Sequence, residues 1–381
     1  MFLKIKILCN SFLIRLINSF FFSIFCPKAR QYYDLVIVRF DSIGDFIIGL
    51  DGIRAYKKIF KGKRILFICK PYTGQLARIS NLFSDIIEVD SGQVNYCLTY
   101  LKQIKRFRYI SAGYVINPTW PRLDPSDWVV RAIRSKNKYG WCCSDNNTSD
   151  CVKGDQFYTR LVRLVPQPSE FYYAQYFINN TIDPTFKAHL PRLDLIYSHE
   201  KPLIKGEYVV VGISAQSINR IWPMERLASV IDYIPGKYNV VLIGYNILDL
   251  RNAIEIESRV ESPQRVINMV NKTSITDVFN LISNAQFVIG MDSAPIHIAA
   301  AARVRSICIA PGAYFKRFVP YPEELGEIEY HPRVVYSFMD CFNCGYNCSH
   351  PELKKGYTWP CLLKVTINMV KNELEKLLKE I

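Results

Sequence analysis

The feature that most constrains the fold is a regular alternation of apolar, strand-like runs with amphipathic, helix-like segments along the chain. Two such series occur, one beginning near residue 34 and the other near residue 207. Strands that alternate with helices form βαβ units, in which parallel strands share one sheet and helices cover its faces. The 381 residues are enough for two domains with a core each. The sequence therefore predicts an α/β protein of two doubly wound, Rossmann-like domains that face a central cleft.

The hydrophobic period places the elements of both series. In the first series we expect strands at residues 34–40, 64–69, 86–89 and 109–116, and helices at 45–60, 73–82 and 95–106. In the second series we expect strands at residues 207–213, 238–244, 265–269, 285–290 and 304–310, and helices at 223–234, 248–260, 274–283, 293–302 and 364–380. Residues 117–200 are less regular, and residues 202–206 are typical of an interdomain linker.

Positive charge is concentrated in the first half of the chain. The net charge is +14, and residues 1–200 carry 28 Lys and Arg against 16 Asp and Glu, whereas residues 201–381 carry 20 against 18. The first half therefore suits an anionic partner, such as nucleic acid, an anionic membrane or a phosphorylated glycolipid. A basic run at Arg131, Arg134, Lys136 and Lys138 is a candidate for this contact, and solvated loop charges are an equal alternative.

Residues 1–30 form an apolar segment that Lys4, Lys6 and Arg15 interrupt. A spanning helix needs about 20 predominantly apolar residues, and an arginine near its middle would be costly. The segment also lacks the small-residue cleavage site of a signal peptide. It fits best a helix lying on the inner leaflet, and a helix packed on the protein's own core is the alternative. We therefore expect a cytoplasmic protein, peripheral on the inner face of the cytoplasmic membrane.

The segment Arg39–Arg54 reads Arg-Phe-Asp-Ser-Ile-Gly-Asp-Phe-Ile-Ile-Gly-Leu-Asp-Gly-Ile-Arg and follows an aliphatic run. Ser42, Gly44 and Asp45 fall on the turn from this strand into a helix. In open α/β sheets ligands bind beyond the carboxyl ends of the strands. A glycine there gives a ligand access to the backbone, and an acid beside it can accept a proton. On this segment alone, a helix cap with a tight turn is an equal interpretation.

Two segments of the second series place polar residues at the same kind of strand end. The first runs from Gly212 to Arg226, and its loop carries Ser214 and Arg220, of which Arg220 can pair with a diphosphate. The second has Asp292 at the end of a strand and Ser293, Ala294 and His297 at the start of an Ala-rich helix. The free N–H groups and the dipole of a helix start form an anion site. A single histidine on such a helix is usually a packed core residue, but together these residues favour a ligand site.

Four segments, taken in order, resemble glycosyltransferase family 9, the heptosyltransferase-like enzymes of bacterial surface glycolipid assembly. The resemblance covers residues 34–375. It rests on Val38-Arg-Phe-Asp-Ser-Ile-Gly-Asp45, Arg220-Ile-Trp-Pro-Met-Glu225, Asn271-Lys-Thr-Ser274 and Asp292-Ser-Ala-Pro-Ile-His297. It implies a GT-B fold, in which the N-terminal domain (31–200) binds the acceptor and the C-terminal domain (201–340) binds the nucleotide-sugar. The chain lacks the Walker A, complete GxGxxG and HExxH motifs of other enzyme classes.

The resemblance also implies roles for single residues. Asp45 matches the acid proposed as the family's base, and Gly44 and Ser42 lie beside it on the acceptor side. Arg220 stands where the family has a basic phosphate contact, commonly lysine. Asp292, Ser293, Ala294 and His297 match the segment that grips the donor, with Ala294 in place of a frequent glycine. The usual Gly-Pro-Thr after the last strand is here Ala310-Pro311-Gly312-Ala313.

The implied activity is inverting, metal-independent transfer of a sugar, with heptose from ADP-heptose favoured, to a hydroxyl of a lipopolysaccharide precursor or another anionic surface glycolipid. A family 9-like transferase with a UDP- or GDP-hexose donor is the alternative. Two further alternatives are a catalytically silent protein of glycan assembly and a nucleic-acid-binding protein. The last lacks any recognisable module, so we expect no nucleic-acid partner.

Twelve cysteines occur, of which Cys69 and Cys308 lie inside apolar strand-like runs. Such scattered cysteines favour a cytosolic, mostly reduced protein. The part of the chain from 341 to 381 holds a separate group, Cys341-x2-Cys344-x3-Cys348-x12-Cys361, ahead of a C-terminal helix. Only its first spacing is standard for zinc. We expect a structural zinc or iron ion that holds this tail, with four free thiols as the alternative, and no cofactor for catalysis.

Overall fold

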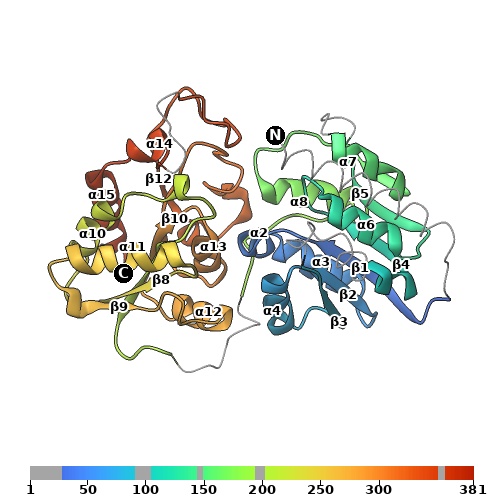
Figure 1. Ribbon diagram of the computed structural model, residues 1–381, viewed down its shortest axis with the longest axis horizontal. Coiled ribbons are helices and arrows are strands. Elements are labelled where there is room, and N and C mark those ends of the chain that lie inside the picture. The colour runs from blue at the N-terminus through green and yellow to red at the C-terminus, as the bar shows by residue number, and fades with distance from the viewer. Residues whose placement is uncertain (1–27, 91–103, 144–148, 194–201, 351–356) are drawn as a thin grey trace, which may run out of the picture. The chain divides into compact units, whose positions relative to one another are not determined.

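The computed structural model describes residues 28–90, 104–143, 149–193, 202–350 and 357–381 (Figure 1). By its contacts the chain divides into two compact units. In the described chain, the first unit comprises residues up to Ser42, Gly52–Pro166 and Ala174–Lys187, and the second comprises Ile43–Asp51, Gln167–Tyr173 and Ala188–Ile381. The helix expected on the membrane lies almost wholly outside the described residues, as does most of the helix expected at 95–106. In the described part of the chain no helix is long and apolar enough to cross a membrane.

The first unit is built on a parallel sheet of six strands in the order β3-β2-β1-β4-β5-β6. Its strands are β1 (Gln31–Arg39), β2 (Ile65–Cys69), β3 (Asp85–Glu88), β4 (Ile110–Asn117), β5 (Asn137–Trp141) and β6 (Arg160–Val162). The residues of β1 from Leu35 to Val38 are completely buried, as expected of an interior parallel strand with both faces covered. The strand order reverses between β1 and β4, and ligands of doubly wound sheets bind at such a switch point.

Helices connect these strands. They are α3 (Leu50–Ile59), α4 (Pro71–Ser80), α6 (Asp124–Ala132), α7 (Ser149–Gly154) and α8 (Glu170–Asn179). Helix α4 packs against β2 and β3, and α6 packs against β1 and β4. The single helix expected at 45–60 is instead two helices, because the chain turns at Gly49 between α2 (Ile43–Ile48) and α3.

The second unit repeats the same topology with the order β12-β11-β10-β7-β8-β9. Its strands are β7 (Tyr208–Gly212), β8 (Asn239–Ile243), β9 (Val266–Asn268), β10 (Val288–Met291), β11 (Ser306–Ile309) and β12 (Arg333–Val335). Its helices are α10 (Met224–Asp232), α11 (Ile247–Arg259), α12 (Ile275–Ser283), α13 (Ala294–Ala301), α14 (Pro360–Leu363) and α15 (Ile367–Leu378). Both units therefore confirm the expected doubly wound α/β fold.

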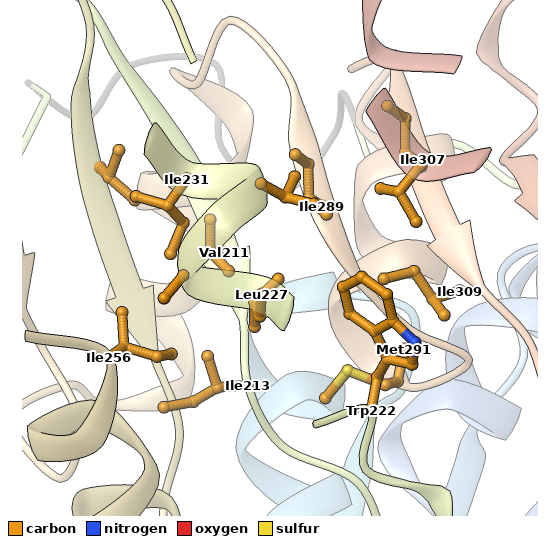
Figure 2. Packing of buried hydrophobic residues seen from close by; sticks show 14 of the residues in the cluster. Val211, Ile213, Trp222, Leu227, Ile231, Ile256, Ile289, Met291, Ile307 and Ile309 are labelled. Atoms are coloured by element: carbon orange, nitrogen blue, oxygen red, sulfur yellow. The ribbon is translucent and has the colours of Figure 1, made fainter. Parts of the chain in front are cut away.

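The core of the second unit joins its central strands to α10, α11 and α15. Figure 2 shows Trp222 beside Met291 of β10, among aliphatic side chains of β7 and β11. Trp222 is fully buried and its Nε1–H donates to the carbonyl of Val365, 3.1 Å away. The Trp-Pro pair of the sequence motif therefore anchors the loop that precedes α10, and with it the position of Arg220.

Candidate functional site

The switch point of the second sheet lies between β7 and β10, which pair with Gly212 opposite Gly290. Both glycines allow close packing at this point. A Cβ atom on Gly212 would lie 3.1 Å from Cγ of Pro295, and one on Gly290 would lie 3.1 Å from the carbonyl oxygen of Gly212. The first turn of α13 can therefore approach the carboxyl ends of these strands, where ligands of doubly wound sheets bind.

Arg220 ends a short 3₁₀ turn, η5 (Ile218–Arg220), in the loop that follows β7. Its Nη2 donates to the backbone carbonyl of Asp292 at 2.6 Å and lies 3.4 Å from Oδ2 of the same residue. Its Nε is buried and has no hydrogen-bond partner among the described residues. Arg220 is thus held by Asp292, and the positive charge of its guanidinium can serve an anionic group.

Asp292 and His297 form a buried chain of polar contacts with Tyr321. Nε2 of His297 lies 3.6 Å from Oδ1 of Asp292, and its Nδ1 lies 2.8 Å from the Tyr321 hydroxyl. Burial by itself raises the pKa of Asp292, but the hydrogen bond and charge of His297, with the charge of Arg220, lower it below its ordinary value. Asp292 is therefore an ionised carboxylate at neutral pH, neutralised by the two basic side chains around it.

Ser293 is the N-cap of α13, and its hydroxyl donates to the Met291 carbonyl at 3.2 Å instead of capping the helix. Ala294 and Pro295 follow as the first helical residues. Because no side chain caps this helix start among the described residues, the positive end of the helix dipole adds to the charge of Arg220. The two features together make an anion-binding edge.

Helix α2 belongs to the second unit, where it packs against α13. A Cβ atom on Gly44 would lie 3.1 Å from Cδ2 of His297 and 3.7 Å from Cα of Ala294. Gly44 therefore serves close helix packing. Asp45 follows it in the first turn of α2 and is partly exposed. Burial raises the pKa of the Tyr346 phenol, and the charges of Asp292 and Asp45 add to this rise.

Ser214 and Ser42 were also expected at the site, and Ser214 follows the end of β7 at the switch point. The hydroxyl of Ser214 donates to the carboxylate of Asp249, which also accepts the backbone N–H of Tyr245 at 2.9 Å, so Ser214 fastens two loops together. Ser42 is exposed and belongs to the first unit.

Arg131 and Arg134 lie at the opposite edge of the first sheet from the end of β1. The backbone of Arg134 bonds to Ile110 and Ala112, at the start of β4. Arg131 ends α6, where its guanidinium packs over the rings of Trp128 and Phe157. The structure does not bring these arginines together with Ser42, because α6 crosses the sheet and delivers the chain to the amino ends of its strands.

Several buried polar residues have no signal in the sequence. In the first unit, Nη1 of Arg122 lies 3.1 Å from Oδ1 of Asp127, which also accepts the hydroxyl of Tyr158 at 2.6 Å. This group holds the loop after β4. The sequence analysis also missed Tyr321 and Tyr346 of the second unit, because each comes from an irregular loop. One signal was available for Tyr346, which stands between two of the clustered cysteines.

The C-terminal cysteines are free thiols, as are Cys69, Cys142 and Cys308, whereas Cys143 is disulfide-bonded. Sγ of Cys341 lies 3.6 Å from Nε2 of His350. Burial raises the pKa of Cys344 and of Cys361, and neighbouring thiolates of the same group add to both effects. Within the described ranges, however, no three His, Cys, Asp or Glu side chains form a group that could hold a metal ion.

Two doubly wound units in one chain, with an anion-binding edge at the switch point of the second, define the class of GT-B glycosyltransferase folds. The model of glycosyltransferase family 9 (heptosyltransferase) matches residues 130–326, which is more than half of the sequence. The chain belongs to glycosyltransferase family 9.

Curated relatives match parts of the chain. Lipopolysaccharide heptosyltransferase 3 of Escherichia coli K12 is 34% identical over 108 residues, which are 28% of this chain and 31% of the relative. Lipooligosaccharide heptosyltransferase 2 of Campylobacter jejuni is 25% identical over 177 residues, or 44% of this chain and 53% of the relative. The chain thus matches 31% and 53% of the length of these two relatives.

Solved structures match nearly the whole chain. The E. coli heptosyltransferase WaaC with ADP superposes with a TM-score of 0.65 at 17% identity, over 92% of this chain and 99% of that one. The iron-containing dodecameric glycosyltransferase TibC of enterotoxigenic E. coli has a TM-score of 0.51 at 15% identity, over 93% of this chain and 78% of that one. At these identities the likeness establishes the fold.

Proposed function

We propose that the chain is an inverting glycosyltransferase that moves heptose from ADP-heptose to a hydroxyl of a lipopolysaccharide precursor or related surface glycolipid. Family membership and the names of the relatives support the class of reaction. A solved neighbour that contains ADP-2-deoxy-2-fluoro heptose supports the donor. The observation that carries the proposal is the meeting of Arg220, Asp292 and α13 at one switch point, with Asp45 of α2 in the same unit.

The donor diphosphate binds at the anion-binding edge in this proposal. Arg220 offers the positive charge of its guanidinium, and the start of α13 adds its dipole. As the bond to the sugar breaks, negative charge grows on the diphosphate. A guanidinium and a helix start that are already in place stabilise this charge without reorganisation. The positive charge for the departing group is thus supplied by the protein, and the proposed transfer needs no metal ion.

Asp45 acts as the general base. The acceptor hydroxyl loses its proton to the Asp45 carboxylate while its oxygen attacks the anomeric carbon and ADP departs. A carboxylate suffices because the proton moves as the new bond forms. One displacement from the face opposite the diphosphate inverts the anomeric centre. Partial exposure of Asp45 supports this role, since the acceptor must reach it.

A panel of nucleotides tests the donor assignment. ADP, UDP and GDP are titrated into the protein by calorimetry, and we expect ADP to bind most tightly. Arg220→Ala should weaken ADP binding by about tenfold or more, because charge-assisted hydrogen bonds contribute about 1.5–3 kcal/mol. Arg251→Ala, which removes an exposed arginine of α11, is the matched control and should bind as the wild type does. Preference for UDP or GDP would instead indicate a hexose donor and contradict the ADP-heptose assignment.

We place the acceptor on the first unit and the protein at the inner face of the cytoplasmic membrane. The excess of basic residues in the first half of the chain supports an anionic glycolipid and an anionic surface. Co-sedimentation with vesicles tests this placement. The full chain should bind vesicles with anionic lipid at low salt and release them at high salt, and equal binding to neutral vesicles would contradict it.

We also propose that the C-terminal cysteines hold a structural zinc or iron ion. Thiolates suit both metals chemically, and the solved neighbour TibC is iron-containing. The described side chains do not assemble a metal site, so no catalytic step is assigned to an ion here. Elemental analysis of the purified chain and of a Cys341→Ser/Cys344→Ser variant tests the proposal. Equal metal content in both proteins would overturn it.

A further inference from the structure

The segment that carries the clustered cysteines lies on the loop that follows β11. Backbone N–H groups of Asn343 and Gly345 donate to the carbonyls of Gly312 and Ala313, at 2.7 Å and 2.9 Å. The N–H of Gly312 in turn contacts Sγ of Cys361 at 3.5 Å. A Cβ atom on Gly312 would overlap the ring of Phe342, which explains why glycine stands where the family pattern has another residue.

This docking delivers Tyr346 to the anion-binding edge. Tyr346 has a φ of 67°, in the left-handed region that is unfavourable for a non-glycine residue. Packing holds it there, since its ring stacks on Trp359 at 5.4 Å between centroids and meets the edge of Tyr314 at 4.6 Å. A strained, well-packed residue of this kind is a candidate for a functional position.

The Tyr346 ring lies over the guanidinium of Arg220, with 5.3 Å between Cζ and the ring centroid. The side chain is also 38% exposed, so a ligand can reach it.

We propose that Tyr346 is a positioning residue of the donor site: its ring holds the Arg220 guanidinium against Asp292 in the orientation that receives the donor diphosphate. The cysteine segment is then a part of the active site as well as a tail. This inference rests on the proposed function, because it takes Arg220 as a diphosphate contact. A cation–π contact of about 0.5–2 kcal/mol corresponds to roughly 2- to 30-fold in affinity.

Calorimetry with ADP tests the proposal on purified full-length variants. Tyr346→Phe keeps the ring and should bind ADP within about twofold of the wild type, whereas Tyr346→Leu should bind about 3- to 30-fold more weakly. Tyr357→Leu removes a 62% exposed tyrosine of the same region and should leave ADP binding unchanged. Thermal unfolding of each variant shows whether it is folded.

A double-mutant cycle separates positioning from general packing. If Tyr346 acts through Arg220, Tyr346→Leu should weaken ADP binding in the wild type and add nothing in an Arg220→Ala background. Equal ADP binding by the wild type and Tyr346→Leu, or equal losses in both backgrounds, would overturn the proposal for Tyr346 alone. Absence of ADP binding by the wild type would overturn the proposed function together with it.

Discussion

His297 organises the proposed donor site because each of its ring nitrogens faces a polar partner. Nδ1 contacts the Tyr321 hydroxyl and Nε2 faces Asp292, while the ring lies parallel to that of Tyr321 with an interplanar angle of 3°. The contact with Tyr321 fixes the ring, and the fixed ring holds the buried carboxylate that orients Arg220. The sequence offered two interpretations of this histidine, a packed core residue or a part of a ligand site. In the structure it is a packed core residue that also contacts the residues of the proposed site.

Replacing His297 tests this coupling through its pH dependence. In the wild type the pKa of Asp292 is below its ordinary value of 3.8, so its contribution to stability is present above about pH 4 and is lost as pH falls through the folded-state pKa. In His297→Phe the contribution of the histidine is lost, so burial dominates and the pKa of Asp292 rises. We expect the variant to lose about 1–3 kcal/mol of unfolding free energy at pH 7.

The difference between the two proteins should shrink as pH falls from 7 towards the lowered folded-state pKa of Asp292 in the wild type, because Asp292 becomes protonated first in the variant and only later in the wild type. Chemical denaturation at pH values across this range measures the difference in unfolding free energy. Adding Asp292→Asn to both proteins serves as the control and should remove the pH-dependent part of the difference. A difference that stays constant with pH would show that His297 contributes only packing.

Single residues of the second half could be placed from the sequence because each directly follows a strand. Arg220 comes from the unit of β7, and Asp292 and His297 from that of β10, and these two strands are neighbours in the parallel sheet, which brings their loops to one edge. Arg131 and Arg134 could not be placed in this way, since a charge run does not reveal at which end of the strands it lies, and their contact with the acceptor stays a prediction. Tyr321 and Tyr346 could not be found because irregular loops carry no periodic signal.

Helix α2 illustrates how an element can be predicted while its partner is not. The sequence shows the helical pattern of α2 after a buried strand. It does not show that α2 packs against α13, which lies more than 240 positions later and approaches closely at Gly44. In contrast, β5 and β6 were missed altogether. Strand β6 has three residues, and β5 begins with Asn137 and Lys138, so neither shows the apolar run of an interior strand.

Gly44→Ala should damage the site through packing. The added Cβ would lie 3.1 Å from Cδ2 of His297, whose ring is held by Tyr321 and cannot easily shift. Overpacking of this kind costs about 1–3 kcal/mol, and we expect both the melting temperature and the transfer rate to fall. Gly236→Ala is the control, because a Cβ there has no neighbour within 4 Å. If Gly44→Ala and Gly236→Ala behave alike, α2 does not depend on this contact.

At the scale of the whole molecule, chain order and spatial grouping differ in one place that matters for function. Chain order places Ile43–Asp51 in the first βα series, whereas its contacts place it in the second unit. The proposed base and the proposed donor site therefore belong to one compact unit, and their spacing does not depend on how the two units are arranged. Gln167–Tyr173 also belongs to the second unit, whose last segment begins at Ala188.

The most direct test of the account compares heptose transfer from ADP-heptose by the wild type and Asp45→Asn, with ADP affinity measured on the same preparations. Losing a general base should lower kcat by about 100-fold or more, while ADP affinity stays within about twofold. Asp51→Asn, at an acid that accepts the His189 backbone N–H at 2.9 Å, should retain transfer. Near-normal turnover by Asp45→Asn would contradict the central claim that Asp45 deprotonates the acceptor beside an Arg220-bound donor.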